Sequence, residues 1–352
     1  MRPISILLTA AGCPGASTCI RYLRGIRERS VKVVGTDANP EAIGRFLCDR
    51  FHTVPPATDP MYIDRLLEVA TGEEVDALIP ASSYEIETVA QSSARFEERG
   101  IQVVASEPEV LRIANNKERL YEACRGDARI RIPAYRTART LEEFLDAVDS
   151  LGFPETQVCF KPSFSKGSRG FRYLSQGMDR VDLLLNYKPD SKFMSLEEFQ
   201  EIFRGRQDFP ELLVMEVVEG EEIDTMVLGY KGESLLLTHK TRERDRGGVI
   251  TQGELVERPA LDETIRAITE KVPLSYNFGV QFIDGALIEI NPRLSTFIYE
   301  DDFVEPYLAV RLALGEITPD EVRSYQGRVP IGLRMIRYFD QHFFMSQQAT
   351  AR

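Results

Sequence analysis

The stretch Phe282–Arg293, which reads FIDGALIEINPR, holds Glu289, Asn291 and Arg293 on alternate residues. Alternation along a strand places all three side chains on one face. The carboxylate and the amide oxygen are hard ligands that suit Mg²⁺, and the guanidinium can bind phosphate through two hydrogen bonds. Pro292 cannot donate a ladder hydrogen bond, so it predicts an edge strand or a strand end. The stretch therefore predicts a site for a metal-bound nucleotide.

Length and composition are those of an ordinary globular protein. The 352 residues predict two or three domains, and 43% hydrophobic with 28% charged residues is a usual balance. The net charge of −12 argues against a nucleic-acid or anionic-membrane partner, because both require a basic face. No apolar run approaches the length of a membrane span, so we expect no membrane partner.

The cysteines indicate a reducing compartment. None of the five stands in CxxC spacing, and an odd, scattered set predicts reduced thiols in a cytoplasmic protein. They are Cys13, Cys19, Cys48, Cys124 and Cys159.

The first third of the chain alternates apolar strand patterns with helical periodicity. This βαβαβ order predicts a parallel sheet with crossover helices. The expected strands are Ile4–Ala10, Val31–Thr36, Ala77–Pro80 and Ile101–Val104, and the expected helices are Ser17–Glu28, Met61–Ala70 and Glu85–Arg99.

From about Leu111 the pattern becomes mixed α+β with antiparallel strands. Asn115 is predicted to cap a helix at Lys117–Ala123, and Thr140 to begin another with Glu143 completing a capping box. The expected strands are Val158–Lys161, Leu212–Val218, Ile223–Leu228, Ser234–Lys240 and a hairpin of Val280–Ile283 with Ala286–Ile290 around Asp284-Gly285. The other expected helices are Leu196–Phe203, Leu261–Lys271 and a last one at Tyr307–Leu314. The chain after Tyr338 is expected to be partly disordered.

Two further segments carry charges next to core strands. Lys161 follows the apolar run VCF, and a lysine at the edge of a core strand usually has an anionic partner. The small residues that follow, with Lys166 and Arg169, suit either a phosphate-binding lid or a flexible surface loop. Glu216 follows LLVM, where a strand end can offer backbone groups to adenine and Glu222 can hold ribose hydroxyls. Taken alone, this last segment would be an acidic hairpin turn, and Lys117 a surface lysine.

Four segments together resemble the ATP-grasp enzymes. These are NKERL, FKPSFSKGSRG, LLVMEVVEGEEID and VQFIDGALIEINPR, in the order and spacing of that superfamily. The N-terminal third resembles the pre-ATP-grasp domain of the carbamoyl-phosphate synthetase and carboxylate–amine ligase branch. The resemblance implies a Rossmann-like α/β domain at 1–112, a two-lobed α+β ATP-grasp domain at 113–325, and a C-terminal segment at 326–352.

The resemblance also implies roles for individual residues and implies ATP with Mg²⁺ or Mn²⁺ as cofactors. The nucleotide site would comprise Lys117 and Lys161 on the phosphates, Gly167, Ser168 and Gly170 in the lid, Glu216 and Val218 at adenine, and Glu222 at the ribose. Gln281, Glu289 and Asn291 would bind the metal, and Arg293 with Lys161 would be catalytic on the transferred phosphoryl group.

The activity that the resemblance implies is an ATP-dependent carboxylate–amine ligase. It would form an amide or peptide bond from small-molecule substrates through an acyl phosphate, releasing ADP and phosphate. Family analogy adds a homodimer as the expected assembly. One alternative is phosphorylation of a small carboxylate or carbamate, as in carbamoyl-phosphate synthetase. After NPR this chain reads Leu294-Ser295-Thr296-Phe297 where many relatives have glycines, which puts an inherited substrate pocket in doubt.

Two rival functions stay open. The turn Gly12-x-x-Gly15 between a strand and a helix, with Asp37 ending the next strand, has the layout of a dinucleotide site for an NAD-dependent oxidoreductase. The same turn can instead bind a substrate carboxylate at the helix N-terminus or simply pack tightly. An oxidoreductase leaves Lys161, Glu216 and Glu289 without a role. The second rival is an ATP-binding regulator without catalysis, against which the phosphoryl-transfer residues argue.

The strand region at 234–246 has two features for which two interpretations stay open. Arg242, Arg244 and Arg246 suit either a substrate anion or a mobile charged surface. His239 is expected to be a strand residue with a satisfied hydrogen bond, with a place in the active site as the alternative.

Overall fold

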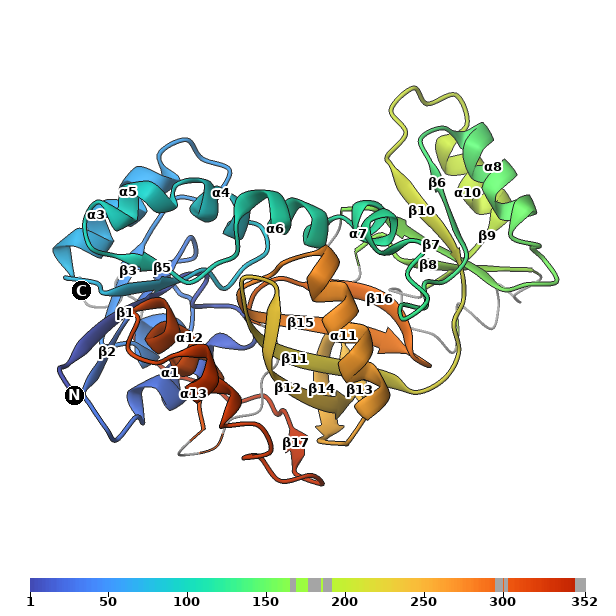
Figure 1. Cartoon of the computed structure of the whole chain (residues 1–352). Coiled ribbons are helices and arrows are strands. Elements are labelled where there is room, and N and C mark those ends of the chain that lie inside the picture. Colours follow the sequence, from blue (N-terminus) through green and yellow to red (C-terminus); the bar gives the residue numbers. More distant parts are fainter. Residues whose placement is uncertain (165–168, 177–184, 186–191, 295–299, 301–302, 346–352) are drawn as a thin grey trace.

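A computed structural model gives the structure of the chain and describes residues 1–164, 169–176, 185, 192–294, 300 and 303–345. Its first part is a five-stranded parallel sheet in the order β3-β2-β1-β4-β5 (Figure 1). The strands are β1 (Ile4–Leu8), β2 (Val31–Asp37), β3 (Arg50–Thr53), β4 (Ala77–Ile79) and β5 (Gln102–Val103). The helices are α1 (Ala16–Arg24), α2 (Gly44–Leu47), α3 (Tyr62–Gly72), α4 (Ile86–Gln91) and α5 (Ser93–Glu97).

This parallel α/β layer confirms the predicted Rossmann-like arrangement. The single helix expected at Glu85–Arg99 is wrong, because Ser92 leaves the helical conformation (φ −104°, ψ 7°) and separates α4 from α5. The strand β3 at the sheet edge was not predicted.

Both faces of this sheet are covered. Ile4, Ile6 and Leu8 are buried on the face that packs against α1 and against α12 (Glu305–Ala313) from far along the chain. Leu7 points to the opposite face, where α3 buries Leu66 among others. The C-terminal helices therefore share a core with the first sheet, and Figure 1 shows α12 beside α1.

Two helices connect this layer to the rest of the chain. They are α6 (Pro108–Asn115) and α7 (Lys117–Cys124), and the predicted boundary at residue 112 lies within α6. The expected cap at Asn115 is wrong by one residue. Asn116 has the extended backbone of an N-cap, and its side chain accepts a hydrogen bond from the Arg119 N–H at 3.0 Å, while Asn115 is still helical.

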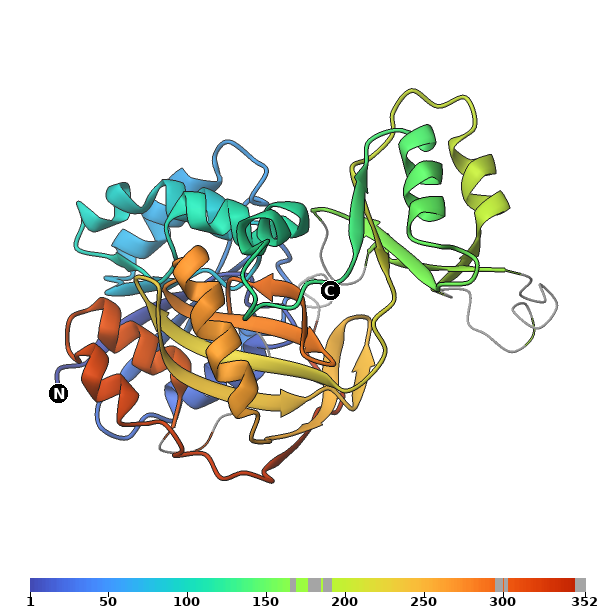
Figure 2. The ribbon, with the colours of Figure 1, turned by 45° about the vertical axis from the view of Figure 1, so that its right-hand side comes forward.

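A smaller lobe stands apart from the body of the molecule in Figures 1 and 2. Its sheet has the order β6-β10-β7-β8-β9, covered by helices whose Phe144 and Phe199 rings stack at 3.8 Å between centroids. Its elements are β6 (Tyr135–Ala138), α8 (Leu141–Ser150), β7 (Val158–Pro162), β8 (Arg172–Ser175), β9 (Phe193–Ser195), α10 (Leu196–Phe203) and β10 (Leu212–Glu216). Thr140 caps α8 as predicted, but the Glu143 carboxylate accepts from the Arg139 N–H, so no full capping box forms.

The larger lobe is built on a four-stranded antiparallel sheet in the order β12-β11-β15-β16. Its elements are β11 (Glu222–Tyr230), β12 (Glu233–Thr241), α11 (Pro259–Lys271), β15 (Tyr276–Ile283) and β16 (Ala286–Asn291). The predicted turn Asp284-Gly285 joins β15 to β16 with positive φ at both residues (45° and 74°). β16 is an edge strand, as Pro292 predicted.

The remaining elements are β13 (Arg244–Arg246), β14 (Val249–Glu254), α13 (Pro319–Arg323) and β17 (Arg334–Ile336). β13, β14 and β17 form a small sheet of their own. The helix expected to be the last is α12, which α13 follows. Beyond Tyr338 the described chain reaches the first layer, where the Phe46 ring lies 4.3 Å from that of His342 and 4.7 Å from that of Phe344 between centroids. Residues 346–352 of the predicted tail lie outside the described residues.

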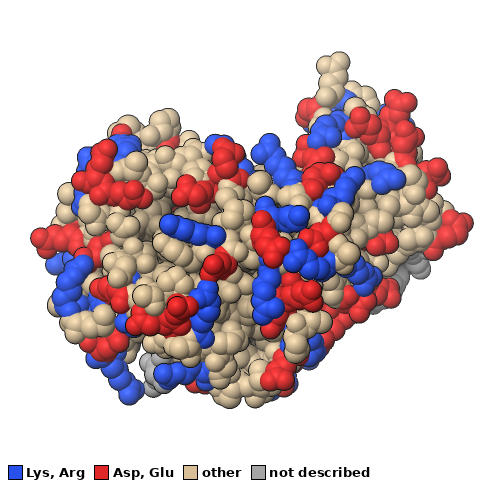
Figure 3. All heavy atoms as spheres, viewed as in Figure 1, with Lys and Arg blue, Asp and Glu red and all other residues tan. Residues whose placement is uncertain are grey.

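The surface and the helices carry two features that bear on partners. On the face seen in Figure 3, acidic and basic side chains are interspersed without a continuous basic area. Among the described residues, no helix has both the length and the apolar composition that crossing a membrane requires.

Candidate functional site

A cavity of about 510 Å³ lies where the first layer and the two lobes meet. The first layer contributes Cys13 to Ala16 and Ser82 to Tyr84, the smaller lobe contributes Lys161, and the larger lobe contributes β11, β15 and β16. Six of the predicted site residues line it together: Lys117, Lys161, Glu222, Gln281, Glu289 and Asn291. Arg293 is the seventh. Segments more than 170 residues apart in sequence thus converge on one hollow.

Lys117 and Lys161 bring two buried ammonium groups to one side of the cavity. Lys117 is only 5% exposed and Lys161 only 6% exposed, although each lysine carries a charge. Lys117 Nζ lies 3.5 Å from Oε2 of Glu289, and Lys161 Nζ lies 3.4 Å from the Ile288 carbonyl oxygen. The first turn of α7 is tied to the smaller lobe because the Lys117 N–H donates to the Ser163 carbonyl at 3.0 Å.

Lys117, Lys161 and Glu289 are close enough for their charges to shift the pKa values of Lys161 and Glu289. Burial and the neighbouring Lys117 lower the pKa of Lys161 to about 8, against which Glu289 acts in part. Burial alone would raise the pKa of Glu289, but Lys117 and Lys161 outweigh it and hold this pKa below its usual value. Glu289 is therefore an ionised carboxylate at neutral pH, with two cations facing it.

A β-bulge aims Glu289 into the cavity. The register of β15 and β16 shifts between Gln281 and Phe282, so that Gln281 pairs with Glu289 while Phe282 pairs with Leu287. Leu287 is buried in the core, whereas Ile288, Glu289 and Asn291 line the cavity. The alternation predicted for Glu289 and Asn291 thus holds, and Asn291 Nδ2 donates to Glu289 Oε1 at 3.3 Å.

Arg293 leaves the strand end and reaches the first layer. Its Nε donates to the Ser83 hydroxyl at 2.6 Å and one terminal nitrogen donates to the Leu294 carbonyl at 2.7 Å. Burial lowers the pKa of this guanidinium, while Cys13 and Glu289 act in the opposite direction. The first layer therefore fixes the orientation of Arg293 at one end of the cavity.

Glu222 is already engaged by protein groups. Its carboxylate accepts a hydrogen bond from Gln281 Nε2 and pairs with Arg242, whose Nε lies 2.6 Å away. Burial raises the pKa of Glu222. Of the three arginines at 242–246, Arg242 lines the cavity, while the Arg246 guanidinium lies over the Phe339 ring.

Three predicted nucleotide residues lie away from the cavity wall. The Glu216 carboxylate accepts a hydrogen bond from the Ala134 N–H at 3.0 Å and so ties β10 to the start of β6. Val218 and Gly170 do not line the cavity. Gly170 has φ 75°, and a Cβ there would approach Pro162 Cδ to 2.7 Å, so it closes the loop tightly against β7. Gly167 and Ser168 lie outside the described residues.

The structure adds residues that sequence reasoning missed. Asp224 and Arg337 line the cavity, the second from the C-terminal segment. The loop Ser82–Tyr84 is held by the buried Glu85, which accepts hydrogen bonds from Tyr62 Oη at 2.8 Å and from the Ser82 N–H at 2.9 Å. The apolar run before Ser82 predicted a strand end, but nothing local connected that loop with residues 200 positions later.

The glycine turn of the first layer is closed by its own aspartate. Asp37 accepts hydrogen bonds from the Gly12 N–H and the Asn39 N–H, both at 2.8 Å. A Cβ on Gly12 would lie 2.9 Å from that of Ala42, so the turn is also tightly packed. The carboxylate that a dinucleotide ribose would require is thus occupied by the backbone, which favours the packing interpretation of this turn.

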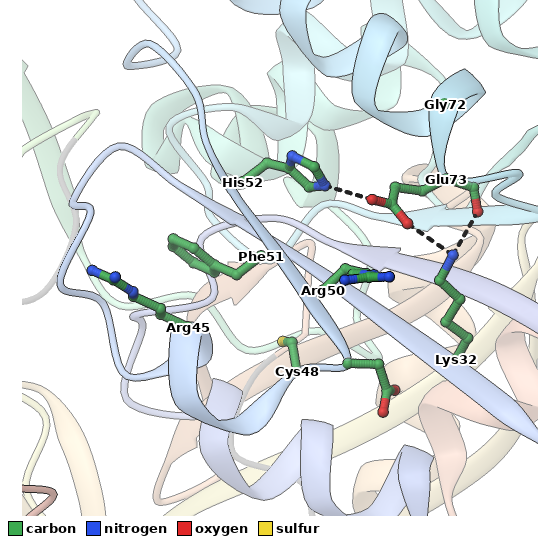
Figure 4. Close-up of a pocket in the computed structure, with 9 residues that line it drawn as sticks. Lys32, Arg45, Cys48, Arg50, Phe51, His52, Gly72 and Glu73 are labelled. Carbon is green, nitrogen blue, oxygen red and sulfur yellow. Dashed lines mark hydrogen bonds and ion pairs between the residues drawn. The ribbon is translucent and has the colours of Figure 1, made fainter. Parts of the chain in front are cut away.

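A second pocket of about 640 Å³ lies at the edge strand β3 (Figure 4). Lys32 and His52 both turn toward Glu73, at 2.8 Å each. Cys48 also lines it, but burial raises the pKa of this thiol to about 12, so it is no nucleophile at neutral pH. Of the predicted site residues that the structure describes, none lines this pocket.

Comparison with known sequences agrees with both parts of the fold. A family model described as PylC-like, N-terminal domain, matches residues 6–104. A model described as ATP-grasp in the biosynthetic pathway with Ter operon matches residues 208–329. The chain is 22% identical over 333 residues to the carbamoyl phosphate synthase large chain of Methanothermobacter thermautotrophicus, which covers 88% of this chain and 29% of that protein. It thus spans less than a third of that relative's length.

Solved structures share the architecture. N5-carboxyaminoimidazole synthetase from Staphylococcus aureus, in complex with ADP, is similar with a TM-score of 0.64 at 14% identity over 87% of this chain and 77% of that one. The biotin carboxylase domain of the Hydrogenobacter thermophilus 2-oxoglutarate carboxylase, a dimer with MgADP and bicarbonate, gives a TM-score of 0.60 at 19% identity over 88% and 69%. The predicted resemblance and fold are confirmed: a Rossmann-like layer is followed by a two-lobed ATP-grasp arrangement.

Proposed function

We propose that this chain, an ATP-grasp protein by sequence and by fold, is an ATP-dependent carboxylate–amine ligase that releases ADP and phosphate. The observation that supports this most is the meeting of Lys117, Lys161 and Glu289 within one cavity. Two buried ammonium groups face the ionised Glu289 carboxylate there. A bound polyphosphate would bring further negative charge to these two buried cations.

Lys117 and Lys161 would bind the phosphates of the nucleotide. Burial lowers the pKa of Lys161, and an anion bound in the cavity would raise that pKa again by stabilising the charged form. Glu222 would hold the ribose, which requires it to exchange part of its contact with Arg242 for hydroxyl groups. Glu216 and Val218 would offer backbone groups to adenine, and Gly167, Ser168 and Gly170 would close over the phosphates.

Gln281, Glu289 and Asn291 fit Mg²⁺ or Mn²⁺. One ionised carboxylate and two amide oxygens are hard donors, and few protein ligands suffice when phosphate oxygens complete the shell. The amide nitrogen of Gln281 donates to Glu222, which leaves its oxygen as the atom for a metal. A divalent ion bound there would neutralise the phosphoryl oxygens. The described residues contain no group of three His, Cys, Asp or Glu that suggests another metal site.

The reaction would proceed in two displacements. A carboxylate oxygen of the first substrate attacks the γ-phosphorus, the bond to the β-phosphate oxygen breaks, and ADP leaves. The amine then attacks the carbonyl carbon of the acyl phosphate, phosphate leaves, and the amine loses a proton as the amide forms. Arg293, oriented by Ser83, would hold the transferred phosphoryl group, and Lys161 would offset its charge.

The alternative within the same chemistry is phosphorylation of a small carboxylate or carbamate. It is favoured by the similarity to carbamoyl phosphate synthase over most of this chain, although the chain spans only 29% of that protein. The two reactions differ in product, because this alternative ends at an acyl or carbamoyl phosphate without an amide.

Three further points belong to the proposal. The substrates would be small molecules, since the cavity holds about 510 Å³. A homodimer is proposed by analogy with the dimeric biotin carboxylase domain. All five cysteines are free thiols, which suits the cytoplasmic location that we propose.

The test is ³¹P NMR of the protein with ATP, Mg²⁺ and a pool of amino acids and small carboxylates. We expect substrate-stimulated ADP and phosphate, lost in Glu289→Ala and retained in Glu263→Ala, an acidic residue on the outside of α11. AMP with pyrophosphate, or turnover that survives Glu289→Ala, would contradict the proposal. Nucleotide binding without turnover on any pool would favour the regulator.

A further inference from the structure

Behind the cavity wall lies a buried group of three charged residues, Lys240, Asp224 and Glu305, here called the Lys240 cluster. Lys240 and Glu305 have no exposed surface and Asp224 has 3%. Lys240 Nζ lies 2.7 Å from Oδ2 of Asp224. Among the described residues, neither carboxylate oxygen of Glu305 has a hydrogen-bond partner. Burying such groups costs more than burying apolar side chains of the same volume, so packing alone does not account for them.

The register of the larger-lobe sheet connects this cluster to the site. Asp224 pairs with Lys240 on one side and with Gln281 on the other, and Gln281 pairs with Glu289. Directly paired residues in antiparallel strands point to the same face with Cβ atoms about 4.5–5.5 Å apart. Lys240, Asp224, Gln281 and Glu289 therefore form one row across β12, β11, β15 and β16, which lie side by side in Figure 1.

One end of this row lines the cavity and the other end is buried behind the cavity wall. Asp224, Gln281 and Glu289 line the cavity, whereas Lys240 and Glu305 do not. Asp224 also acts on Arg293, so it belongs to the reactive end of the cavity. Without an adjacent cation, Asp224 would present a second full negative charge to any polyphosphate bound beside Glu289. The repulsion between two unit charges a few ångströms apart is large in a water-poor site.

We propose that Lys240 is a positioning residue of the nucleotide site, which acts through Asp224. Its ammonium group holds the Asp224 carboxylate at the cavity wall and offsets its charge, so that a polyphosphate beside Glu289 does not also meet the uncompensated charge of Asp224. Glu305 acts on the ammonium through its charge and does not line the cavity. The inference rests on the proposed function, because it requires a nucleotide phosphate in front of Asp224.

The proposal predicts effects of opposite sign for the two members of the ion pair. Lys240→Met leaves Asp224 ionised and uncompensated, and we expect ADP affinity without metal to fall about tenfold. Asp224→Asn removes the negative charge and leaves the ammonium, and we expect metal-free ADP to bind about threefold more tightly. Lys240→Met/Asp224→Asn removes both charges and should return the affinity to within about threefold of the wild type.

The experiment is calorimetric titration of the full chain with ADP, with and without Mg²⁺, for these variants. Asp262→Asn, on the opposite side of the sheet, serves as the matched control and should leave ADP affinity unchanged. If Lys240→Met fails to fold, the sign of the Asp224→Asn effect and the affinity of the charge-balanced double variant still decide. A purely structural role would lower the affinity in every variant of the cluster, and that result would overturn the inference.

Different results would contradict the proposed function and the role of Lys240. Wild-type protein that binds no ADP, with or without Mg²⁺, would contradict the proposed function itself. Wild-type protein that binds ADP, with Asp224→Asn weaker or Lys240→Met unchanged, would overturn only the role of Lys240.

Discussion

The two faces of the larger-lobe sheet treat buried polar groups in opposite ways. On the face under α11, the apolar side chains of Val227, Phe278 and Val280 form the core, and His239 and Thr225 are buried polar residues paired on the same face. His239 Nδ1 lies 2.8 Å from Thr225 Oγ1 and its Nε2 lies 2.7 Å from Asp262 Oδ1, so both ring nitrogens are satisfied. This confirms the expectation of a strand histidine with a satisfied hydrogen bond.

The next residue along β12 is Lys240, which points to the other face. There the charged groups Glu222, Asp224, Glu289 and Lys161 gather around a cavity. Within the part of the chain that the structure describes, the buried Glu305 carboxylate has no hydrogen-bond partner. The protein thus satisfies its polar groups where a face only supports the fold. It leaves charges incompletely paired where a ligand is expected to complete them.

We expect the largest effect of a substitution on turnover at the cavity face of the sheet. Glu289→Gln keeps the size of the side chain but removes the charge opposite Lys117 and the metal-binding carboxylate. We expect turnover to fall about 10³-fold or more, equivalent to roughly 4 kcal/mol, with little change in the denaturant midpoint. A variant that keeps most of its activity would show that this face is not catalytic. Phosphate release is the measurement.

The α11 face should respond in the opposite way. Phe278 is fully buried, and Phe278→Ala should lower the free energy of unfolding by roughly 3–5 kcal/mol because it leaves a cavity. At a temperature where the variant is folded, nucleotide affinity should be unchanged. Urea unfolding followed by circular dichroism measures the first effect, with Phe278→Leu as the milder control. A large loss of nucleotide affinity in the folded variant would contradict the claim that the α11 face serves only stability.

Lys161 offers a test of incompletely paired charge. Its pKa lies at about 8 in the folded chain and at 10.5 unperturbed, so the unfolded chain binds more protons between these values. Stability of the nucleotide-free protein should therefore rise as pH increases from 8 to 10.5. Lys161→Met should remove this rise, stabilise the protein by roughly 1–3 kcal/mol at pH 7, and weaken ADP binding. Destabilisation at pH 7 would show that Lys161 supports the fold.

The smallest expected effect concerns His239, whose pKa burial lowers from 6.5 although Asp262 opposes this. The unfolded chain takes up the proton first, so stability should decline as pH falls below about 6.5. His239→Gln should abolish that decline and cost about 1 kcal/mol at pH 8. Denaturant midpoints at pH 5.5 and 8 measure both quantities, and an unchanged slope would exclude His239 as its source.

The sequence predicted those site residues that stand at the ends of apolar runs. Lys161, Glu289 and Asn291 each stand near the end of a recognisable core strand, so their side chains could be placed at a sheet edge before any fold was known. Asp224 was missed because it is a single polar residue in an apolar strand, and its importance depends on the cross-strand register with Lys240. The bulge at Ile288 and the hydrogen bond from the Ala134 N–H to the Glu216 carboxylate likewise depend on tertiary contacts, and no local sequence pattern encodes them.

Short elements were lost for a related reason. β8, β9, β13 and β17 have three or four residues each, too few for an alternating pattern to be distinguished from a loop. They exist because neighbouring strands supply their hydrogen bonds. The domain boundaries and the roles of individual nucleotide residues remain predictions that binding and structural experiments have to test.

The most direct measurement is a crystal structure of the chain with ADP and Mn²⁺, whose anomalous scattering locates the metal. We expect the metal at Glu289 and Asn291, with phosphate oxygens within hydrogen-bonding distance of Lys117 and Lys161. A nucleotide bound instead at the Gly12–Gly15 turn beside Asp37, with the two lysines uninvolved, would contradict this expectation.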